Sequence, residues 1–435
     1  MQKLDSGTYS DVFYNPMQNI VKKYSTLLCE DGVIDTNIIC EAVFTRAVEG
    51  VQGTPKLDTI SINANVVEEV MPYYGTTLHK WVRHNTIEKR LAMMPNIVLG
   101  VCRICLDMQK LGIQHTDIKP SNIVISDSGN VTLIDFNMCS TRTTRKCCQT
   151  QWTHSIGTWA FCAPEMILHE QPTNTSMIWS IGMLIPFIAY QHHPLTMQKN
   201  YPTAETQQAW KKKYIDIAIK YKNGLPISMS DVSCINQSMI GLYKRCMMWD
   251  HNKRISLQVL VQCILAGMKE KPPLRIICGS IPTFDPSKHI HRHTDFAKML
   301  DVCKKNERMD LICRAICLYD LLPYNDTLNH GIASLLLSYI IQGSVPLPSK
   351  TFTQTIINVF NYNMDHTEIN RIVLKVGSLV NWRCYFKPLD ILFLEDNGAL
   401  PNVLEISLLY NCVLSCKTAY TLSDIYERYK NLQLN

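Results

Sequence analysis

The stretch LGIQHTDIKPSNIVISDSGNVTLIDFNMCS, which runs from Leu111 to Ser140, contains four residues in an order that calls for an explanation. They are two carboxylates, a lysine and an asparagine: Asp117, Lys119, Asn122 and Asp135. Asp117 and Asn122 share one loop, whereas Asp135 follows two apolar runs that flank the turn-rich DSGN and predict a short hairpin. We therefore expect the four side chains to meet in the folded protein.

These residue types suit the transfer of a phosphoryl group from ATP. That reaction needs the phosphates and a metal ion held in line and the developing charge neutralised. Asp117 could accept or orient the hydroxyl proton of the substrate, and Lys119 could lie against the transferred phosphate. Asn122 and Asp135 could hold Mg²⁺ through oxygen atoms, the ligands that this hard cation prefers.

Composition predicts a globular protein of two domains. The chain has 435 residues, of which 46% are hydrophobic and 18% charged, and its formal net charge is +6. A mild charge without a long basic run argues against direct nucleic-acid binding. The N-terminus lacks the layout of a secretion signal, and apolar runs such as MLIPFIAY are too short to cross a bilayer. We expect an intracellular protein of the cytoplasm, the nucleus or both, without a membrane partner.

The cysteine and histidine patterns do not predict a metal centre. Eighteen cysteines are scattered through apolar helical patterns, which is typical of reduced, buried thiols. Cys102 and Cys105 have C-x2-C spacing, but no second pair lies at the distance of a zinc site. The cluster HIHRH, residues 289–293, is interpreted as part of a solvated linker.

The patterns of apolar residues in 1–268 predict a small β-rich part followed by helices. MQKLDSGTYSDVFYNPMQNIVKKYS alternates around small residues and turns at Asn15, which predicts two or three antiparallel strands. Residues Asp35–Val48 have helical apolar spacing, and a strand pair ending in VVEEVMPYYG follows. Apolar residues at helical spacing predict a long buried helix, with Pro95 near its start and Gly112 at its end. Helical patterns dominate from Pro164 onward.

A proline-rich break, residues 269–293, predicts a linker before a second domain, residues 294–435. Beyond the break, apolar periodicity predicts a compact all-helical module with at least five helices. Thr367 is the expected cap of the last one. The predicted segments are Phe296–Cys303, Met309–Leu322, Gly331–Ile341, Phe352–Tyr362 and Thr367–Val380.

HTDIKPSN followed by DFN resembles the catalytic and metal loops of eukaryotic protein kinases. The resemblance covers roughly Met1–Met268 and implies a bilobal α+β kinase fold, with a small β-rich N-lobe and a helical C-lobe. It implies a serine/threonine kinase that transfers the γ-phosphate of ATP to protein hydroxyls, because Lys119 in DIKPSN and Thr158 in GTWAFCAPE follow the pattern of that class. Magnesium and protein substrates are the implied cofactor and partners.

The same resemblance extends upstream to the expected nucleotide site. LDSGTYSDVF resembles the glycine-rich phosphate loop, although only Gly7 of its glycines is kept, and Val12 follows it. IVKKY resembles the strand whose lysine binds the α- and β-phosphates, and alternation with Ile20 favours Lys22 over Lys23. Glu41 in IICEAVF matches the helix glutamate that pairs with this lysine, and a surface glutamate is the alternative.

Two further stretches complete the resemblance. VMPYYGTTL resembles the hinge that cradles adenine, with Met71 as gatekeeper and the backbone around Tyr73 hydrogen-bonding the base. GTWAFCAPE resembles the end of an activation segment. WDHNKRIS supplies Arg254, which in this family pairs with the glutamate of that segment, here Glu165.

Three residues depart from the kinase pattern. Thr116 stands where an arginine normally receives an activation-loop phosphate, so we predict that activity does not require phosphorylation in TRTTRKCCQTQWTH. Asn137 replaces a glycine, which is mild because asparagine tolerates left-handed backbone angles. Met177 replaces a buried aspartate that normally braces the catalytic loop, so bracing must come from elsewhere or catalysis is slow.

The second domain resembles a cyclin box over about Thr294–Leu394. The resemblance lies in Asp320, in the small-residue helix GIASLLLS and in a last helix that runs through Trp382. A plain helical bundle is the alternative. The lysine and glutamate with which cyclins grip a kinase are missing, because Ile340 and Gln342 stand near their places. We expect the module to pack in cis against the helix that carries Glu41 and to keep the Lys22–Glu41 pair formed.

Two other functions stay open on the sequence. The first is a pseudokinase scaffold, a protein-interaction module that the weak glycine loop and Met177 favour. The second is a small-molecule phosphotransferase of the aminoglycoside type, against which the Lys119–Pro120 step and APE argue.

Overall fold

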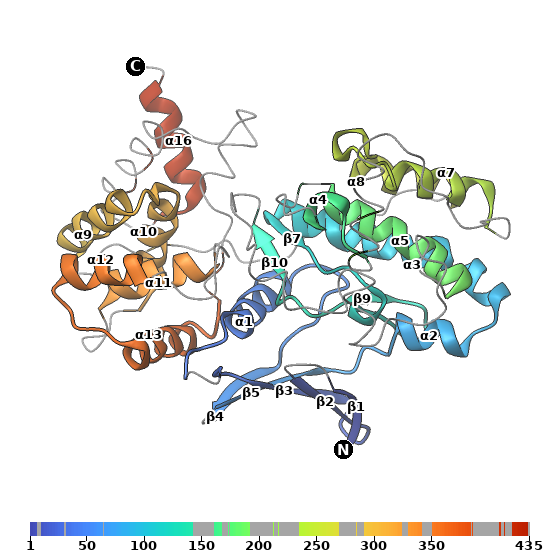
Figure 1. Ribbon diagram of the computed structural model, residues 1–435, viewed down its shortest axis with the longest axis horizontal. Helices are drawn as coiled ribbons and strands as arrows, with labels where there is room; N and C mark the ends of the chain where they lie inside the picture. Colours follow the sequence, from blue (N-terminus) through green and yellow to red (C-terminus); the bar gives the residue numbers. More distant parts are fainter. Residues whose placement is uncertain are drawn as a thin grey trace.

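The computed structural model describes residues 1–6, 10–29, 32–63, 65–141, 161–167, 173, 175–191, 212, 216, 235–268, 284, 291–323, 329–341, 350–383, 385, 409, 413 and 420–433. Gly7, Thr158, Gln342, the stretch 142–154 and most of the predicted linker therefore lie outside the described residues. Figure 1 shows an N-terminal sheet, a central group of helices and a second helical part that ends in α16.

The N-terminal sheet has five antiparallel strands in the order β1-β2-β3-β5-β4. Asn15 closes the first predicted turn by accepting the backbone N–H of Met17 at 3.1 Å. The predicted antiparallel strands are thus confirmed. The strands are β1 (Gln2–Ser6), β2 (Ser10–Asn15), β3 (Ile20–Thr26), β4 (Thr59–Asn63) and β5 (Val66–Pro72).

Helix α1 (Thr36–Val48) follows β3 and begins where Asp35 accepts the backbone N–H of Asn37 at 2.9 Å. All but two of its residues are buried. A surface helix buries one face only, so a helix buried all round must be covered on both sides. In Figure 1, α1 lies between the central part of the molecule and helices α11 (His330–Ile341) and α13 (His366–Leu379).

The long central helix α3 (Ile87–Lys110) begins earlier than predicted. Thr86 caps it by accepting the backbone N–H of Lys89 at 3.4 Å, so Pro95 lies inside the helix instead of at its first turn. Among the described helices α3 is long and apolar enough to cross a membrane, but 56% of its apolar window is buried in the fold. Packing against α5, α8 and β9 accounts for that apolar character.

Short elements precede and carry the stretch from Leu111 to Ser140. They are β6 (Thr76–Thr77), α2 (Leu78–His84), β7 (Ile113–His115), η1 (Pro120–Asn122), β8 (Ile123–Ile125), β9 (Val131–Leu133) and β10 (Cys139–Thr141). Strands β8 and β9 pair antiparallel, which confirms the hairpin around DSGN. The helices that follow are α4 (Pro164–Ile167), α5 (Ser176–Tyr190), α7 (Gln237–Cys246), η4 (His251–Lys253) and α8 (Leu257–Met268).

The C-terminal part is helical throughout its described residues, apart from the bridge between Phe284 and Tyr420. Its helices are α9 (Arg292–Lys305), η6 (Met309–Leu311), α10 (Ile312–Leu321), α11, α12 (Lys350–Phe360), α13 and α16 (Leu422–Gln433). All five predicted helical segments are present. Asp365, and not Thr367, caps α13, because its side chain accepts the backbone N–H of Glu368 at 2.8 Å.

The described ends of the predicted linker belong to the C-terminal part. Phe284 is fully buried and exchanges two backbone hydrogen bonds with Tyr420. Arg292 begins α9 and forms a buried ion pair with Asp320, whose other partner is the hydroxyl of Tyr420 at 2.7 Å. Within the described part of residues 269–293, Phe284 and Arg292 are buried, whereas His291 and His293 are exposed. The linker bounds therefore stay a prediction.

The described cysteines are all free thiols. Cys102 and Cys105 lie buried in α3, and burial raises the pKa of Cys105 to about 12. Both cysteines belong to the hydrophobic core.

Candidate active site

Lys23, and not Lys22, faces the interior of the N-terminal sheet. Residues directly opposite each other in an antiparallel pair lie on one face, and Lys23 stands opposite Val12 and the buried Glu69. Lys22 lies on the other face, where it binds Glu68 at 2.5 Å. The prediction that Lys22 pairs with Glu41 is therefore wrong. The prediction assumed that Ile20, being apolar, faces the interior of the sheet. Ile20 instead lies on the outer face of β3, together with Lys22.

The ammonium of Lys23 forms a buried ion pair with Glu41 of α1 and lies 3.9 Å from Asp135 Oδ1. Glu69 of β5 is its third carboxylate neighbour. Burial alone would lower the pKa of Lys23, but the charges of these three carboxylates outweigh burial and raise it. Lys23 is therefore a fixed positive charge at the junction of the sheet, α1 and the opening stretch.

Two of the predicted nucleotide contacts share the face of Lys23. Val12 is its direct neighbour on β2, and Met71 lies two positions along β5 from Glu69. Tyr73 differs from the prediction, because its backbone N–H donates to the carbonyl of Asn19 at 3.0 Å and its ring packs on Tyr14. A backbone donor to a bound base would have to come from a neighbour of Tyr73.

The opening stretch forms a compact polar cluster. Lys119 Nζ lies 2.6 Å from Asp117 Oδ2, and Asn122 Nδ2 donates to the same oxygen at 3.1 Å. Asn122 also donates to the backbone carbonyl of Asp117 at 3.0 Å, and both side chains are buried. The predicted trio of Asp117, Lys119 and Asn122 is thus brought together on one loop.

His115 ties this loop to the residue before Asp135. Its Nδ1 accepts the backbone N–H of Asp117 at 3.2 Å, which leaves Nε2 to donate to the carbonyl of Ile134 at 3.2 Å. Burial lowers the pKa of His115, so the ring stays neutral and keeps one donor and one acceptor. Sequence reasoning missed this residue, although its place two residues before Asp117 was a signal.

Met177 does not brace the loop directly. It is buried, and the nearest polar contact that it makes is with Gln109 Nε2, 3.8 Å from its sulfur. The backbone N–H of Asp117, which needs an acceptor when buried, finds one in His115. His115, which belongs to the same loop, therefore makes the bracing contact that the sequence did not assign to a residue.

Two buried carboxylate oxygens of the site could hold a cation. Asp117 Oδ1 and Asp135 Oδ1 have no hydrogen-bond partner in the described part of the chain. Buried oxygens without donors fit Mg²⁺, which takes oxygen ligands and keeps several waters. No three His, Cys, Asp or Glu side chains gather as a metal site among the described residues. Magnesium here would thus need Asn122, water or phosphate oxygens beside Asp135.

The backbone strain of the metal loop lies at Asp135 and not at Asn137. Asp135 has a φ of +67°, in the left-handed region, whereas Asn137 is not among the residues with positive φ. Asn137 therefore does not adopt the left-handed backbone angle that the sequence led us to expect. An aspartate held at a strained angle is typical of a functional position.

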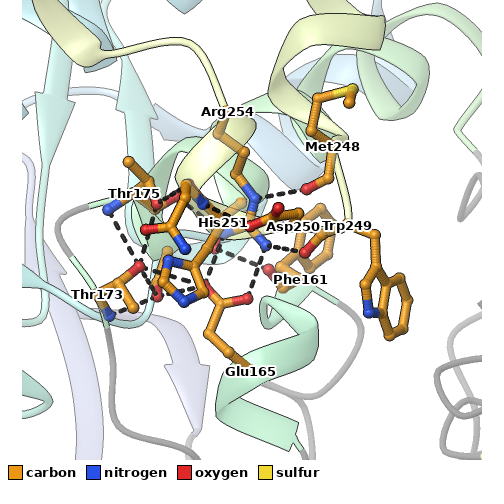
Figure 2. Close-up of polar contacts among 12 residues, drawn as sticks. Phe161, Glu165, Thr173, Thr175, Met248, Trp249, Asp250, His251 and Arg254 are labelled. Carbon is orange, nitrogen blue, oxygen red and sulfur yellow. Dashed lines mark hydrogen bonds and ion pairs between the residues drawn. The ribbon is translucent and has the colours of Figure 1, made fainter. Parts of the chain in front are cut away.

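Glu165 and Arg254 form the predicted structural ion pair. Figure 2 shows the guanidinium of Arg254 against both carboxylate oxygens of Glu165, at 2.6 and 2.7 Å. Ser176 donates to Glu165 at 2.6 Å, and the carbonyl of Met248 accepts from Arg254 Nε at 2.8 Å. Every face of the pair is satisfied, which is what a buried ion pair requires.

Thr116, at the place of the usual arginine, makes a local contact instead. Its hydroxyl donates to the backbone carbonyl of Met138, just before β10. Strand β10 in turn pairs with β7, with Cys139 opposite His115. The first residues of the expected activation segment are thus held by backbone pairing and a threonine hydroxyl.

The C-terminal helices contact the outer side of α1. Cys40 of α1 donates through its thiol to the carbonyl of Ile340 in α11, at 3.6 Å. At the N-terminal end of α1, Asn370 of α13 donates to the carbonyl of Gly32 at 2.9 Å. At its C-terminal end, Arg383 binds Glu49 at 2.8 Å. These contacts cover both ends and the middle of the helix.

Tyr385 links α1 to the end of α3. Its hydroxyl donates to the carbonyl of Leu111, the residue that caps α3, at 2.9 Å, and its ring lies 5.4 Å from that of Phe44 in α1. The guanidinium of Arg314 lies 5.3 Å from the ring centroid of Tyr385. One side chain from the C-terminal part thus touches both the helix that carries Glu41 and the residue just before β7.

Residues 56–264 match the family described as protein kinase domain. Mitogen-activated protein kinase kinase 1 of Arabidopsis thaliana is 24% identical over 180 residues, which are 40% of this chain and 48% of that protein. Serine/threonine-protein kinase PknL of Mycobacterium tuberculosis is 32% identical over 112 residues, 25% and 28% of the two chains. Serine/threonine-protein kinase shk2 of Schizosaccharomyces pombe is 28% identical over 140 residues, 29% and 23%.

These matches support a eukaryotic-type protein kinase domain within residues 56–264, and two of the relatives named here are serine/threonine-protein kinases. A β-sheet N-terminal region followed by helices fits the bilobal kinase fold. The chain covers less than half of the length of these relatives. Lys23 and Glu41 precede the matched residues, so their assignment depends on the geometry described above.

Proposed function

We propose that this chain is a serine/threonine protein kinase that transfers the γ-phosphate of ATP to protein hydroxyls inside the cell, with Mg²⁺ as cofactor. The observation that carries the proposal is the convergence of Lys23 on Asp135, 3.9 Å away, next to the cluster of Asp117, Lys119 and Asn122. An ammonium, two carboxylates and an amide from separate segments thus surround one place.

Each of these residues has a distinct task in the proposed reaction. Asp117 Oδ2 is held by Lys119 and Asn122, which leaves Oδ1, without a partner in the described residues, to accept the hydroxyl proton of the substrate. Lys119 and Lys23 supply positive charge toward the transferred and the α- and β-phosphates. Asn122 and Asp135 would hold Mg²⁺, which supplies charge neutralisation on the phosphates when bound.

We also propose that residues 1–268 are the kinase domain and that the helices from about 294 to 435 form a cyclin-like domain that acts in cis on α1. The buried Arg292–Asp320 pair gives Asp320 a structural task in that module. The lysine and glutamate of cyclins are absent, and the carbonyl of Ile340 accepts from Cys40 at this interface. A tethered domain meets its target at millimolar effective concentration, so it needs a weaker surface than a separate protein.

The test of the kinase proposal is transfer of labelled γ-phosphate from ATP and Mg²⁺ to a generic basic protein, comparing the native chain with Asp117→Asn. We expect transfer by the native chain and a loss of about 10²–10⁴-fold in the variant, which keeps its shape but not its base. Absence of transfer by well-folded native protein would favour the pseudokinase scaffold. The weak glycine loop and Met177 at the place of the usual aspartate are the features that favour this second function.

A further inference from the structure

The first strand of the N-terminal sheet has a break in its pairing. Among the described strands, β1 lies at the edge of the sheet and pairs with β2 alone. The register of this pair shifts between Lys3 and Asp5, so Leu4 is an extra residue without an opposite partner in the ladder. Such a β-bulge disrupts the ladder locally, and bulges are frequent at sheet edges and beside active sites. The sheet therefore holds β1 least firmly at Leu4.

A side chain from outside the sheet binds β1 at this bulge. Lys80 of α2 donates through Nζ to the backbone carbonyl of Leu4 at 2.7 Å. The two residues are 76 positions apart in the sequence. Because a charged donor forms a stronger hydrogen bond than a neutral one, this contact can replace some of the hold that the bulge removes.

The helix that carries Lys80 is anchored to the catalytic loop. Leu78 and Val82 of α2 are fully buried, and α2 packs on η1, which ends at Asn122. Just before α2, strand β6 pairs with β8. The chain enters this pair through Gly75, where a Cβ would lie 2.3 Å from the carbonyl oxygen of Ile125. The bond from Lys80 therefore joins the part that holds the catalytic loop to the edge of the N-terminal sheet.

This bond lies at the outer edge of the proposed nucleotide site. Val12 of β2 is on the sheet face that carries the buried lysine, and Asp5 of β1 stands opposite Val12. On the same strand pair, the ring of Tyr14 packs on that of Tyr73 in the expected hinge, with 4.3 Å between the centroids. The bond from Lys80 and this ring pair thus hold β1 and β2 on the segment that would cradle the base.

We propose that Lys80 is a positioning residue that closes the outer edge of the nucleotide site by holding β1 on α2, and that bound nucleotide leaves when this bond opens. This inference rests on the proposed function, which assigns the nucleotide to that site. Lys80 is exposed, so water competes for its ammonium and the bond can open and close readily. The effect on nucleotide release is therefore several-fold and not all-or-none.

The test uses two measurements on the full chain. The first is amide hydrogen exchange of residues 2–6 without nucleotide, and the second is release of a fluorescent ADP analogue with Mg²⁺ on mixing with excess ATP. Lys80→Met removes the donor and keeps most of the apolar stem, so we expect both rates to rise about fivefold. Lys80→Arg keeps a charged donor and should stay within about twofold of the native chain.

Lys89→Met is the matched control, because Lys89 is exposed near the start of α3, where its backbone N–H binds Thr86. It removes the same charge, and both rates should stay within about twofold of native. This variant separates the bond to β1 from a general attraction between positive charge and the nucleotide.

Three results would overturn the proposal. The first is a release rate in Lys80→Met that equals the native rate. The second is faster release with unchanged exchange of β1, which would mean that Lys80 contacts the nucleotide directly. The third is a Lys89→Met variant that behaves as Lys80→Met does. A folded native chain that binds no nucleotide would instead reject the proposed function, and this role of Lys80 with it.

Discussion

Lys23 of β3 is bound to Glu41 of α1 in a buried ion pair, and the preceding residue of the same helix, Cys40, donates to the carbonyl of Ile340 in the C-terminal part. The position of Glu41 is therefore fixed jointly by the sheet and by helices that follow it by some three hundred residues. A substitution where α1 meets the C-terminal helices should therefore also affect the ion pair between Lys23 and Glu41.

Removing Tyr385 should weaken catalysis from a distance. Tyr385→Ala deletes the ring against Phe44 and the hydroxyl bond to Leu111, so we expect the transfer rate to fall about tenfold or more. Tyr362→Ala is the matched control, because that tyrosine binds Glu368 within the C-terminal part. Steady-state rates with a basic protein substrate check this, and equal losses in both variants would contradict it.

Substitution of Asp135 should lower activity and raise the magnesium requirement, whereas substitution of Asn137 should have little effect. Asp135→Asn removes the carboxylate that lies 3.9 Å from Lys23, and we expect a loss of at least about 10²-fold in activity with a higher magnesium requirement. Asn137→Gly should stay within about threefold, because Asn137 is not at a left-handed angle. Titration of the rate with Mg²⁺ measures both. An unchanged magnesium requirement in Asp135→Asn would remove this residue from the metal site.

Stability should depend on the buried pair of Glu165 and Arg254. Arg254→Met leaves a buried carboxylate without its partner, and we expect a loss of about 3–5 kcal/mol in the free energy of unfolding. Exposed Lys253→Met is the control and should change it by less than about 0.5 kcal/mol. Urea unfolding of the full chain gives both values.

The same pair sets a pH dependence. Burial alone would raise the pKa of Glu165, but the hydrogen bonds and charge of Arg254 lower it below its ordinary value of 4.5. The stabilisation is thus fully present above about pH 4.5 and is lost as the pH falls through the lowered pKa. Between pH 6 and pH 3, the native chain should lose more stability than Arg254→Met, and parallel curves would contradict the assignment.

Activity should not require phosphorylation of the activation segment. Thr116 lacks the positive charge with which an arginine binds a phosphate group. The start of the activation segment is fixed instead by the pairing of β10 with β7 and by the hydrogen bond from the Thr116 hydroxyl to the carbonyl of Met138. We expect phosphatase-treated protein to retain its rate within about twofold. Phosphate-free protein that is silent until a threonine in 141–154 is modified would refute this.

The sequence was most informative where function depends on local spacing. Asp117, Lys119 and Asn122 lie within one loop, so their order along the chain already determines that they meet. The choice between Lys22 and Lys23 needed the strand register, because a one-residue slip moves a side chain to the other face. Ile20, partly exposed on the outer face, gave the wrong signal.

Contacts between distant segments could be predicted only in outline. That the C-terminal helices would pack on α1 followed from the resemblance, but the contacts made by Asn370, Arg383 and Tyr385 depend on how two surfaces meet. His115 as the brace of the loop was not foreseen, because a histidine in sequence does not reveal which groups its two nitrogens will find.

The most direct test of the account is the phosphoryl-transfer rate of Lys23→Met beside that of Lys22→Met, measured with labelled ATP and Mg²⁺ on the full chain. The two lysines are adjacent and carry the same charge, but only Lys23 lies against Glu41 and Asp135. We predict that Lys23→Met loses at least about 10²-fold in rate and that Lys22→Met stays within about threefold. Loss of activity in Lys22→Met with Lys23→Met unaffected would contradict the central claim.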